Sequence, residues 1–245
     1  MSQTKPERPP PKHRLLDTIL DSFVPIHRDG QKFIGIGLIA TFLLFLFWQP
    51  LGWLMALVTA WIAYFFRDPD RVTPLRDGLV IAPADGRVQA IDKVRPPAEL
   101  GLGDDERTRV SIFLSVFDVH INRSPVAGMI KRRLYVPGSF LNAAVDKASE
   151  ENERCALIVT TSAGTDIAVV QIAGWVARRI ITFVKEGEAV GVGDRIGLIR
   201  FGSRADVYLP PNKTALVSVG QRAIAGETIL ADLKSEEPER EARVS

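Results

Sequence analysis

The hydrophobic and polar positions divide the chain into segments with different patterns. Residues 33–66 contain no Asp, Glu, Lys or Arg and are almost entirely apolar. From about residue 75 onward, short β-branched runs alternate with Gly, Pro, Asp and Asn. A long uncharged run is typical of a membrane segment, whereas short apolar runs between turn residues are typical of strands. The pattern therefore predicts a helical membrane segment followed by a mainly β domain.

The uncharged run is interrupted near its middle by Gln49-Pro50. Proline favours a break or kink in a helix, and each half is somewhat short for a bilayer about 30 Å thick. Basic residues flank both ends, which favours both ends on the cytoplasmic side. A helical hairpin is therefore favoured, and a single tilted span stays open. The flanking residues are Arg28, Lys32, Arg67, Arg71 and Arg76.

The later segments predict a mainly β fold with minor α content, a barrel or sandwich of the swapped-hairpin type. The clearest hairpin is "CALIVTTSAGTDIAVVQI", in which residues 162–164 form the turn. Residues 139–154 are expected to form a helix or an ordered loop. The expected organisation is a polar segment with an amphipathic helix (1–32), the membrane segment (33–66), the β domain (67–232) and a charged flexible tail (233–245).

Composition excludes several classes of protein. The 245 residues carry a net charge of +2, which does not indicate a nucleic-acid-binding protein. Cys155 is the single cysteine and lies in an apolar run, so we expect a buried strand residue in a reducing compartment. The three histidines are far apart and lack the spacing of metal ligands, so no metal site is expected.

Three polar residues interrupt strand-like runs. Asp85 lies in "APADGRV", His120 in "SVFDVHINRSP" and Ser203 directly after Gly202 in "RFGSRADVY". Each is ordinary by itself, as a turn, a structural histidine or a Gly-Ser pair. Together they are the parts of a Ser-His-Asp arrangement. The chain lacks the G-x-S-x-G turn of hydrolases, and the carbonyl nearest to Ser203 in sequence is that of Gly202. A serine in this place is suited to attack its own preceding peptide bond.

Four segments carry a resemblance to a known family. They are "RIGLIRFGSRADVYLP", "APADGRV", "FDVHINRSP" and "FLNAAVDKASEENER". In this order, and with an apolar N-terminal region, they closely resemble the phosphatidylserine decarboxylase proenzymes of the short bacterial form. The resemblance covers residues 15–232.

The resemblance implies self-cleavage between Gly202 and Ser203, which converts Ser203 into a covalent pyruvoyl group. That group serves as an electron sink for the decarboxylation of phosphatidylserine to phosphatidylethanolamine. By the family pattern Asp85 orients His120, and His120 is the base for Ser203. The family's H-x-x-H variant has a second histidine where this chain has Arg123, so Arg123 becomes a candidate for binding the substrate carboxylate or phosphate.

Further expectations concern the substrate and the location. Phe140 and Leu141 are weaker candidates for the acyl-chain entrance. Self-cleavage divides the sequence into a large chain (residues 1–202) and a small chain (203–245). The two chains are expected to stay associated at the bacterial inner membrane, with the catalytic domain on the cytoplasmic side. Homodimerisation stays open. Candidates for contact with anionic headgroups are Lys131, Arg132, Arg133, Arg178 and Arg179.

Two alternatives remain at this point. Two hairpin-like phrases, "IAPADGRVQAI" (81–91) and "VKEGEAVGVGDRIGLI" (184–199), fit a non-catalytic module similar to lipoyl or biotinyl domains. The turn of the first phrase, however, offers Asp85-Gly86-Arg87 in place of a lysine. A soluble pyruvoyl enzyme for a small amino acid is disfavoured by the uncharged segment, because a water-soluble substrate gives no reason for a membrane anchor.

Overall fold

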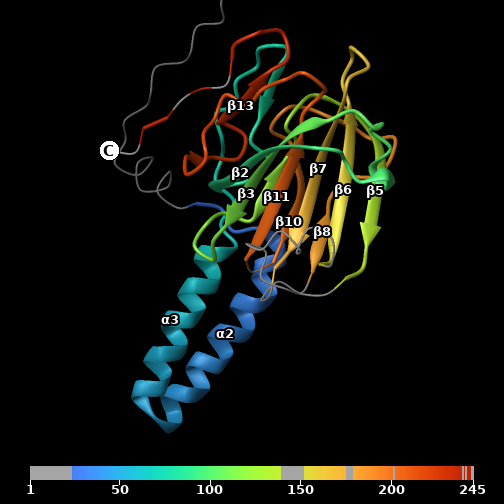
Figure 1. The fold of residues 1–245 in the computed structure, drawn as a ribbon. Coiled ribbons are helices and arrows are strands. Elements are labelled where there is room, and N and C mark those ends of the chain that lie inside the picture. Colours follow the sequence, from blue (N-terminus) through green and yellow to red (C-terminus); the bar gives the residue numbers. More distant parts are fainter. Residues whose placement is uncertain are drawn as a thin grey trace, which may run out of the picture.

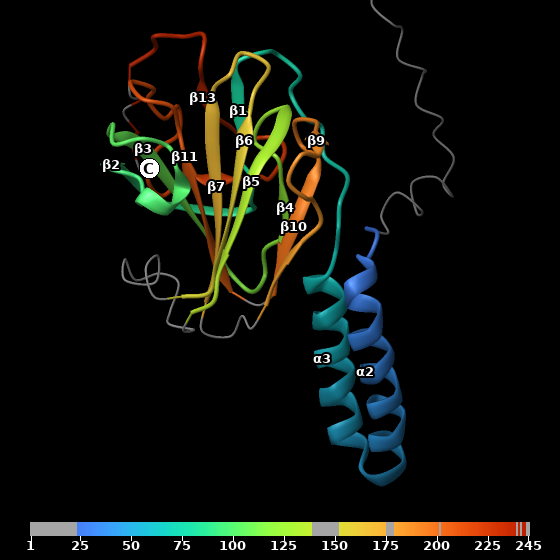
Figure 2. The same ribbon diagram turned by 90° about the vertical axis from the view of Figure 1, so that its right-hand side faces the viewer.

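A computed structural model describes residues 24–138, 152–174, 179–200, 202–238, 240 and 242–243. A helical hairpin projects from one end of a β domain, as two perpendicular views show (Figures 1 and 2). This arrangement confirms the predicted mainly β fold with an apolar helical segment before it. Residues 139–151, including Phe140 and Leu141, lie outside the described residues, as does Arg178.

The hairpin consists of α2 (Arg28–Phe47) and α3 (Gln49–Phe65). His27 caps α2 by accepting a hydrogen bond from the backbone of Asp29 (3.3 Å). Trp48 is extended and separates the helices, and Pro50 lies in the first turn of α3, where a proline costs no helical hydrogen bond. The Gln49-Pro50 interruption therefore marks a helix start, and in the structure the segment is a hairpin rather than one span.

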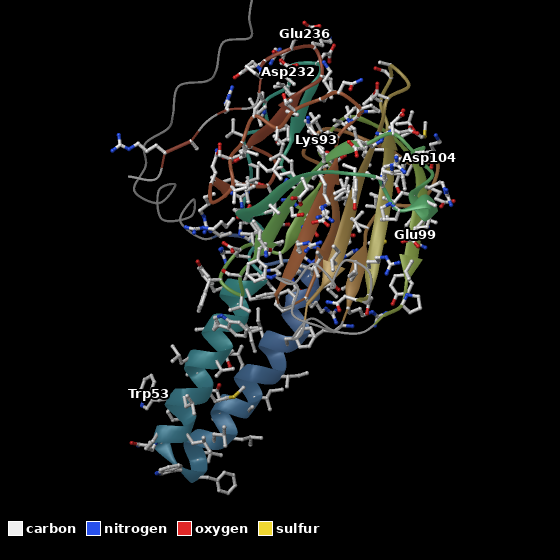
Figure 3. All side chains as sticks on the ribbon, viewed as in Figure 1. Trp53, Lys93, Glu99, Asp104, Asp232 and Glu236 are labelled. Atoms are coloured by element: carbon white, nitrogen blue, oxygen red, sulfur yellow. The ribbon has the colours of Figure 1, made fainter. Side chains whose placement is uncertain are left out.

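Small residues let the two helices approach each other. A Cβ atom added to Gly37 would lie 2.6 Å from Thr59 Oγ1, and one added to Gly52 would lie 2.4 Å from Phe45. The outer faces, by contrast, expose large apolar side chains, and α2 is long and apolar enough to cross a membrane. Figure 3 shows Trp53 near the free end of the hairpin, at the opposite end of the molecule from Asp232 and Glu236. Close backbone packing at small residues with apolar outer faces is typical of membrane helices.

Within the described residues the strands form sheets of two, three and eight strands. Their orders are β1-β13, β4-β10-β8 and β12-β2-β3-β11-β7-β6-β5-β9. The strands are β1 (Leu79–Ile81), β2 (Gly86–Val94), β3 (Arg107–Leu114), β4 (Ile121–Arg123), β5 (Gly128–Val136), β6 (Arg154–Thr160), β7 (Asp166–Ala173), β8 (Ile180–Thr182), β9 (Ala189–Val190), β10 (Arg195–Ile199), β11 (Ser203–Tyr208), β12 (Arg222–Ala223) and β13 (Ile229–Asp232). A short 3-10 helix, η1 (Ala98–Leu100), precedes β3.

The predicted hairpin is confirmed as β6 and β7, which pair in antiparallel register from Arg154 with Ile172 to Thr160 with Asp166. Gly164 forms its turn with a φ of 78°. The two hairpin-like phrases behave differently, because their strands do not pair with each other. β1 pairs with β13 while β2 pairs with β3, and β9 pairs with β5 while β10 pairs with β4. Each turn thus passes the chain from one sheet to another.

The main core lies inside the curled sheet and includes Val88, Ile112, Leu157 and Val207. A separate apolar cluster joins the hairpin to the β domain. In this cluster Phe65 and Phe66 pack against Val119, Ile121 and Leu198. The hairpin is thereby fixed to the strand ends rather than tethered by a free linker.

The charged C-terminal segment also contacts the β domain. Lys213 Nζ donates to the Ser235 carbonyl (3.1 Å), and the Arg240 guanidinium donates to the carbonyl of Leu216 (3.2 Å). Hydrogen bonds from basic side chains to backbone carbonyls thus join the described part of this segment to the β domain. The amino-acid composition of the segment does not predict such contacts.

Candidate active site

His120 lies just before β4 and is fully buried. Its Nδ1 atom is 2.9 Å from the backbone carbonyl of Asp118, and its Nε2 atom is 3.3 Å from the backbone nitrogen of Gly202. A carbonyl oxygen can only accept and a backbone N–H can only donate. The imidazole therefore carries its proton on Nδ1, and Nε2 accepts from the backbone N–H of Gly202, one residue before Ser203.

The surroundings of His120 keep it neutral. Burial lowers its pKa to about 4, although the backbone and side chain of Asp118 act in the opposite direction. The ring of Phe65 lies over the imidazole with the two centroids 4.2 Å apart. The last turn of α3 thus supplies the apolar cover that disfavours the imidazolium form.

Gly202 directly precedes β11, which begins at Ser203. Gly202 has a φ of 66°, in the left-handed region that favours glycine. Ser203 is fully buried, and its Oγ atom has no hydrogen-bond partner among the described residues. The carbonyl oxygen of Gly202 accepts a hydrogen bond from the backbone of Gly174 (3.0 Å). The structure thus brings together a buried hydroxyl, a neutral base and a carbonyl that is already bonded to an N–H donor.

Asp85 lies in the turn between β1 and β2, and its carboxylate has partners other than His120. Oδ2 forms an ion pair with Arg71 (2.7 Å), and Oδ1 accepts from the backbone of Ala225 (2.8 Å). Burial raises the pKa of Asp85, and Arg71 partly offsets this effect. The Asp85 carboxylate was expected to accept the hydrogen bond from Nδ1 of His120. In this structure the backbone carbonyl of Asp118 accepts that bond instead.

The Asp118 carboxylate orders the loop that precedes His120. It accepts from the backbone of Ser115 (2.8 Å) and forms an ion pair with Arg222. Arg67 interacts electrostatically with both Asp85 and Asp118, and also with His120. Asp85 and the neutral His120 therefore share Arg67 as a charged neighbour, while the hydrogen bonds of the Asp85 carboxylate go to Arg71 and Ala225.

Arg123 lies beside the linker that follows the hairpin. Its guanidinium donates to the carbonyls of Gly193 (3.0 Å) and Pro69 (3.0 Å) and is 3.4 Å from Asp68. These bonds fasten the linker to β4, so a role for Arg123 in substrate binding stays a prediction. Of the basic residues expected at headgroups, Lys131 forms an ion pair with Asp166 (2.6 Å) at the end of the sheet far from Ser203.

Three neighbours of the site were missed by the sequence-based reasoning: Phe65, Arg71 and Gly174. Phe65 was counted only as part of the uncharged run, and Arg71 only as a flanking cation. Gly174 gave no signal beyond following a strand. The tertiary path of the chain, rather than any local motif, brings these residues to His120, Asp85 and Gly202.

These features define a mainly β protein with a buried serine and histidine at the base of an apolar helical hairpin. Among the described residues, no group of three or more His, Cys, Asp or Glu side chains could hold a metal ion. The model of the phosphatidylserine decarboxylase family matches residues 58–231, more than half of the chain. The chain belongs to this family of carboxy-lyases, which decarboxylate phosphatidylserine. The matched range begins within α3, so it includes Phe65 and every candidate residue of the site.

Proposed function

We propose that this protein is a self-processing, pyruvoyl-dependent phosphatidylserine decarboxylase that cuts its own backbone between Gly202 and Ser203. The observation that carries the proposal is the Ser203 hydroxyl, which is buried without a hydrogen-bond partner among the described residues and directly follows Gly202, whose N–H donates to the neutral His120. A buried hydroxyl without a partner is costly for stability, so a chemical role is a reason for its presence.

The first step makes an ester. Nε2 of His120 accepts the hydroxyl proton, Ser203 Oγ bonds to the carbonyl carbon of Gly202, and the peptide C–N bond breaks as the nitrogen takes up a proton. Negative charge develops on the Gly202 oxygen, to which the N–H of Gly174 already donates. The negative charge of Asp85 and Asp118 favours the imidazolium that forms on His120.

The second step separates the chains. Loss of the Cα proton of residue 203 expels the Gly202 carboxylate and leaves a dehydroalanine, and water then replaces its nitrogen, which leaves as ammonia. The products are a chain that ends at Gly202 and a chain that begins with the pyruvoyl group at position 203. A pyruvoyl group fits this position, because residue 203 is enclosed by β3 and β7 and its side-chain oxygen has no competing partner.

The pyruvoyl group would supply an electron sink for the electron pair that stays on the serine headgroup when its carboxylate leaves as CO2. The residues of this chain position that group and manage protons. β11 holds position 203 between Leu114 and Ala173, and the Phe65 ring excludes water from His120. His120 is the candidate proton donor after CO2 is lost, and Arg123, Phe140 and Leu141 remain candidates for contact with the lipid.

The pairing of β11 also supports the association of the two chains after cleavage. All six of its residues pair with β3 on one side and with β7 on the other, and both neighbours belong to the large chain. β12 and β13 of the small chain pair with β2 and β1. A break before Ser203 leaves these ladders intact.

The hairpin supports a location at the bacterial inner membrane, with the β domain in the cytoplasm. Ile26 and Arg67 form a bridge at its base, so both ends lie on the same side of any bilayer into which it inserts. Basic residues at both ends favour the cytoplasmic side. A lipid substrate gives a reason for such an anchor, which favours this enzyme over a soluble pyruvoyl enzyme, and the family match favours it over a carrier module.

Intact-mass measurement of the purified protein tests the proposal. We expect two chains that divide after Gly202, the smaller one without a free amino terminus. Ser203→Ala should give one uncut, inactive chain. Ser111→Ala is the matched control, because Ser111 is also a buried serine whose hydroxyl has no partner among the described residues. A single uncut chain in the parent, or normal cutting of Ser203→Ala, would refute self-processing.

A further inference from the structure

The loop of residues 115–118, between β3 and His120, presents an aromatic side chain to solvent at the base of the hairpin. Phe117 is 62% exposed. Its carbonyl accepts a hydrogen bond from Arg67 (2.8 Å), which directly follows the end of the hairpin. Figure 1 shows this loop, in green, beside the upper end of α3. An exposed aromatic at this point is continuous with the apolar surface of the hairpin.

The fold holds Phe117 in its outward position. The backbone of Phe117 donates to Ser115 Oγ (3.3 Å), and the Asp118 carboxylate accepts from Ser115 (2.8 Å). Asp118 is in turn held by Arg222. Since hydrogen bonds fix the backbone on both sides, exposure of the ring is a property of the folded loop.

The same loop borders the candidate active site. The side chain of Val116 is the nearest neighbour of a Cβ atom placed on Gly202, at 3.9 Å, and Val119 packs in the cluster with Phe65. His120 follows directly. Only a few residues therefore separate the exposed ring from the base and from the scissile peptide.

Cations surround the base of the hairpin. The Arg67 guanidinium lies 3.7 Å from the centroid of the Tyr64 ring, and that of Arg200 lies 5.2 Å from the Phe33 ring. Arg28 and Lys32 are in the first turns of α2. The nearby Asp68 is already paired with Arg195 (2.7 Å). Basic residues beside an exposed aromatic suit an anionic phospholipid surface, where rings lie at headgroup level.

We propose that residues 115–118 form a lipid-contacting loop, in which Phe117 inserts among the headgroups of an anionic membrane and holds the candidate active site close to the bilayer. The loop lets the serine headgroup reach position 203 while the acyl chains stay in the membrane. This inference rests on the proposed function and adds the surface through which the substrate arrives. The hairpin anchors the protein, so the loop acts on delivery of the substrate rather than on anchoring.

The first test compares Phe117→Ser with Met129→Ser. Met129 is exposed to a similar degree (48%) but pairs with Thr160, at the end of the sheet opposite Ser203. Each processed protein is reconstituted into phosphatidylcholine vesicles with phosphatidylserine, and also assayed on a water-soluble short-chain phosphatidylserine. We expect Phe117→Ser to lower kcat/KM about tenfold on vesicles, the order expected when an aromatic ring loses its apolar contact, and to leave the soluble substrate unaffected. Equal loss on both substrates, or none on vesicles, would overturn the proposal.

The second test does not depend on activity. The uncut Ser203→Ala precursor is labelled with a polarity-sensitive fluorophore at Phe117→Cys or, as control, at Ala163→Cys in the β6–β7 turn at the far end of the domain (Figure 1). We expect spin labels attached to lipid headgroups to quench position 117 and not position 163. No quenching at position 117 would show that the loop is exposed to water, and would overturn the proposal. An emission shift that appears without lipid as the protein concentration rises would show that a second copy of the protein covers the loop, and would overturn it as well. Failure of self-processing in the parent leaves this measurement unchanged, so the two proposals can fail separately.

Discussion

The Nε2 atom of His120 lies 3.3 Å from the backbone nitrogen of Gly202, so a buried imidazole accepts a hydrogen bond from the residue immediately before Ser203. These residues are 82 positions apart in the chain. Their contact depends on two elements: the bond from Nδ1 to Asp118, which fixes the tautomer, and β11, which begins at the serine. With its proton on Nδ1, the imidazole directs its Nε2 lone pair at the backbone one residue before Ser203, and that lone pair becomes available to the serine hydroxyl when the Gly202 N–H releases it.

Variants of the ion pair between Asp85 and Arg71 can distinguish a structural role of Asp85 from a chemical one. Arg71→Met leaves a buried carboxylate without its partner and should lower the free energy of unfolding by about 3 kcal/mol. Asp85→Asn leaves the opposite charge uncompensated and should also destabilise the protein. We expect the double variant to regain much of this stability but still to cleave slowly, because an amide supplies no charge to the His120 imidazolium.

Denaturant unfolding in detergent and a gel-based cleavage time course measure the two quantities separately. All variants for unfolding carry Ser203→Ala, so that only uncut chains are compared. Cleavage of the double variant at the parent's rate would make Asp85 only a partner of Arg71 and remove it from the proposed site.

Gly202 is predicted to be needed for its conformation rather than for space. A Cβ atom there would meet only Val116, at 3.9 Å, but the φ of 66° costs a non-glycine residue about 1–2 kcal/mol. Gly202→Ala should still fold, but it should cleave about tenfold more slowly. An alanine must pay the conformational cost to reach the observed backbone geometry, and 1.4 kcal/mol corresponds to about a factor of ten in rate. Gly164→Ala is the control, since it has a φ of 78°, open space and no neighbour in the site. A slower rate in both variants would mean that destabilisation alone is responsible.

Two glycines of α2 offer a matched test of the hairpin. A side chain at Gly37 would collide with Thr59, whereas one at Gly35 would meet nothing within 4 Å. Gly37→Leu should therefore lower the melting temperature of the detergent-solubilised protein, and Gly35→Leu should leave it nearly unchanged. The substitutions have the same composition and hydrophobicity, so equal melting temperatures would contradict the observed helix interface.

The sequence predicted those features that depend on local pattern. The apolar helical segment follows from the uncharged run, and the β6–β7 hairpin and the mainly β class follow from periodicity and turn residues. The structure confirms all three. The break at Gln49-Pro50 also had a local cause, because proline is suited to the first turn of α3. The local pattern did not decide between a helical hairpin and a single span. The close packing of the two helices at Gly37 and Gly52 gives the hairpin its geometry.

The partners within the candidate site depend on long-range packing and could not be predicted in the same way. A contact between Asp85 and His120 was expected because the family resemblance implies that Asp85 orients His120. The linker after the hairpin, however, passes beside the β1–β2 turn and brings Arg71 to Asp85, while the short loop before β4 brings the Asp118 carbonyl to Nδ1. No spacing in the sequence encodes either route.

The low pKa of His120 predicts how stability and cleavage depend on pH. Its pKa falls from 6.5 to about 4 on folding, so the unfolded chain binds the proton more tightly. The stability from the neutral imidazole is therefore complete above about pH 6.5 and is lost as the pH falls towards 4. The shift corresponds to about 3 kcal/mol. Cleavage that uses the neutral base should be independent of pH in the neutral range and slow down only near pH 4.

Denaturant unfolding of the uncut Ser203→Ala precursor between pH 4 and 7.5 checks the first part, because cleavage cannot interfere. Other groups titrate in this range, so the measured quantity is the difference from Ser203→Ala combined with His120→Gln, which keeps a polar side chain but cannot take up the proton. We expect the precursor with His120 to lose about 3 kcal/mol more on acidification than the precursor with glutamine. Parallel stability curves would mean that His120 titrates alike in the folded and unfolded chains. A cleavage rate that falls already near pH 6.5 would lead to the same conclusion, because the base would then be exposed to water rather than enclosed by Phe65.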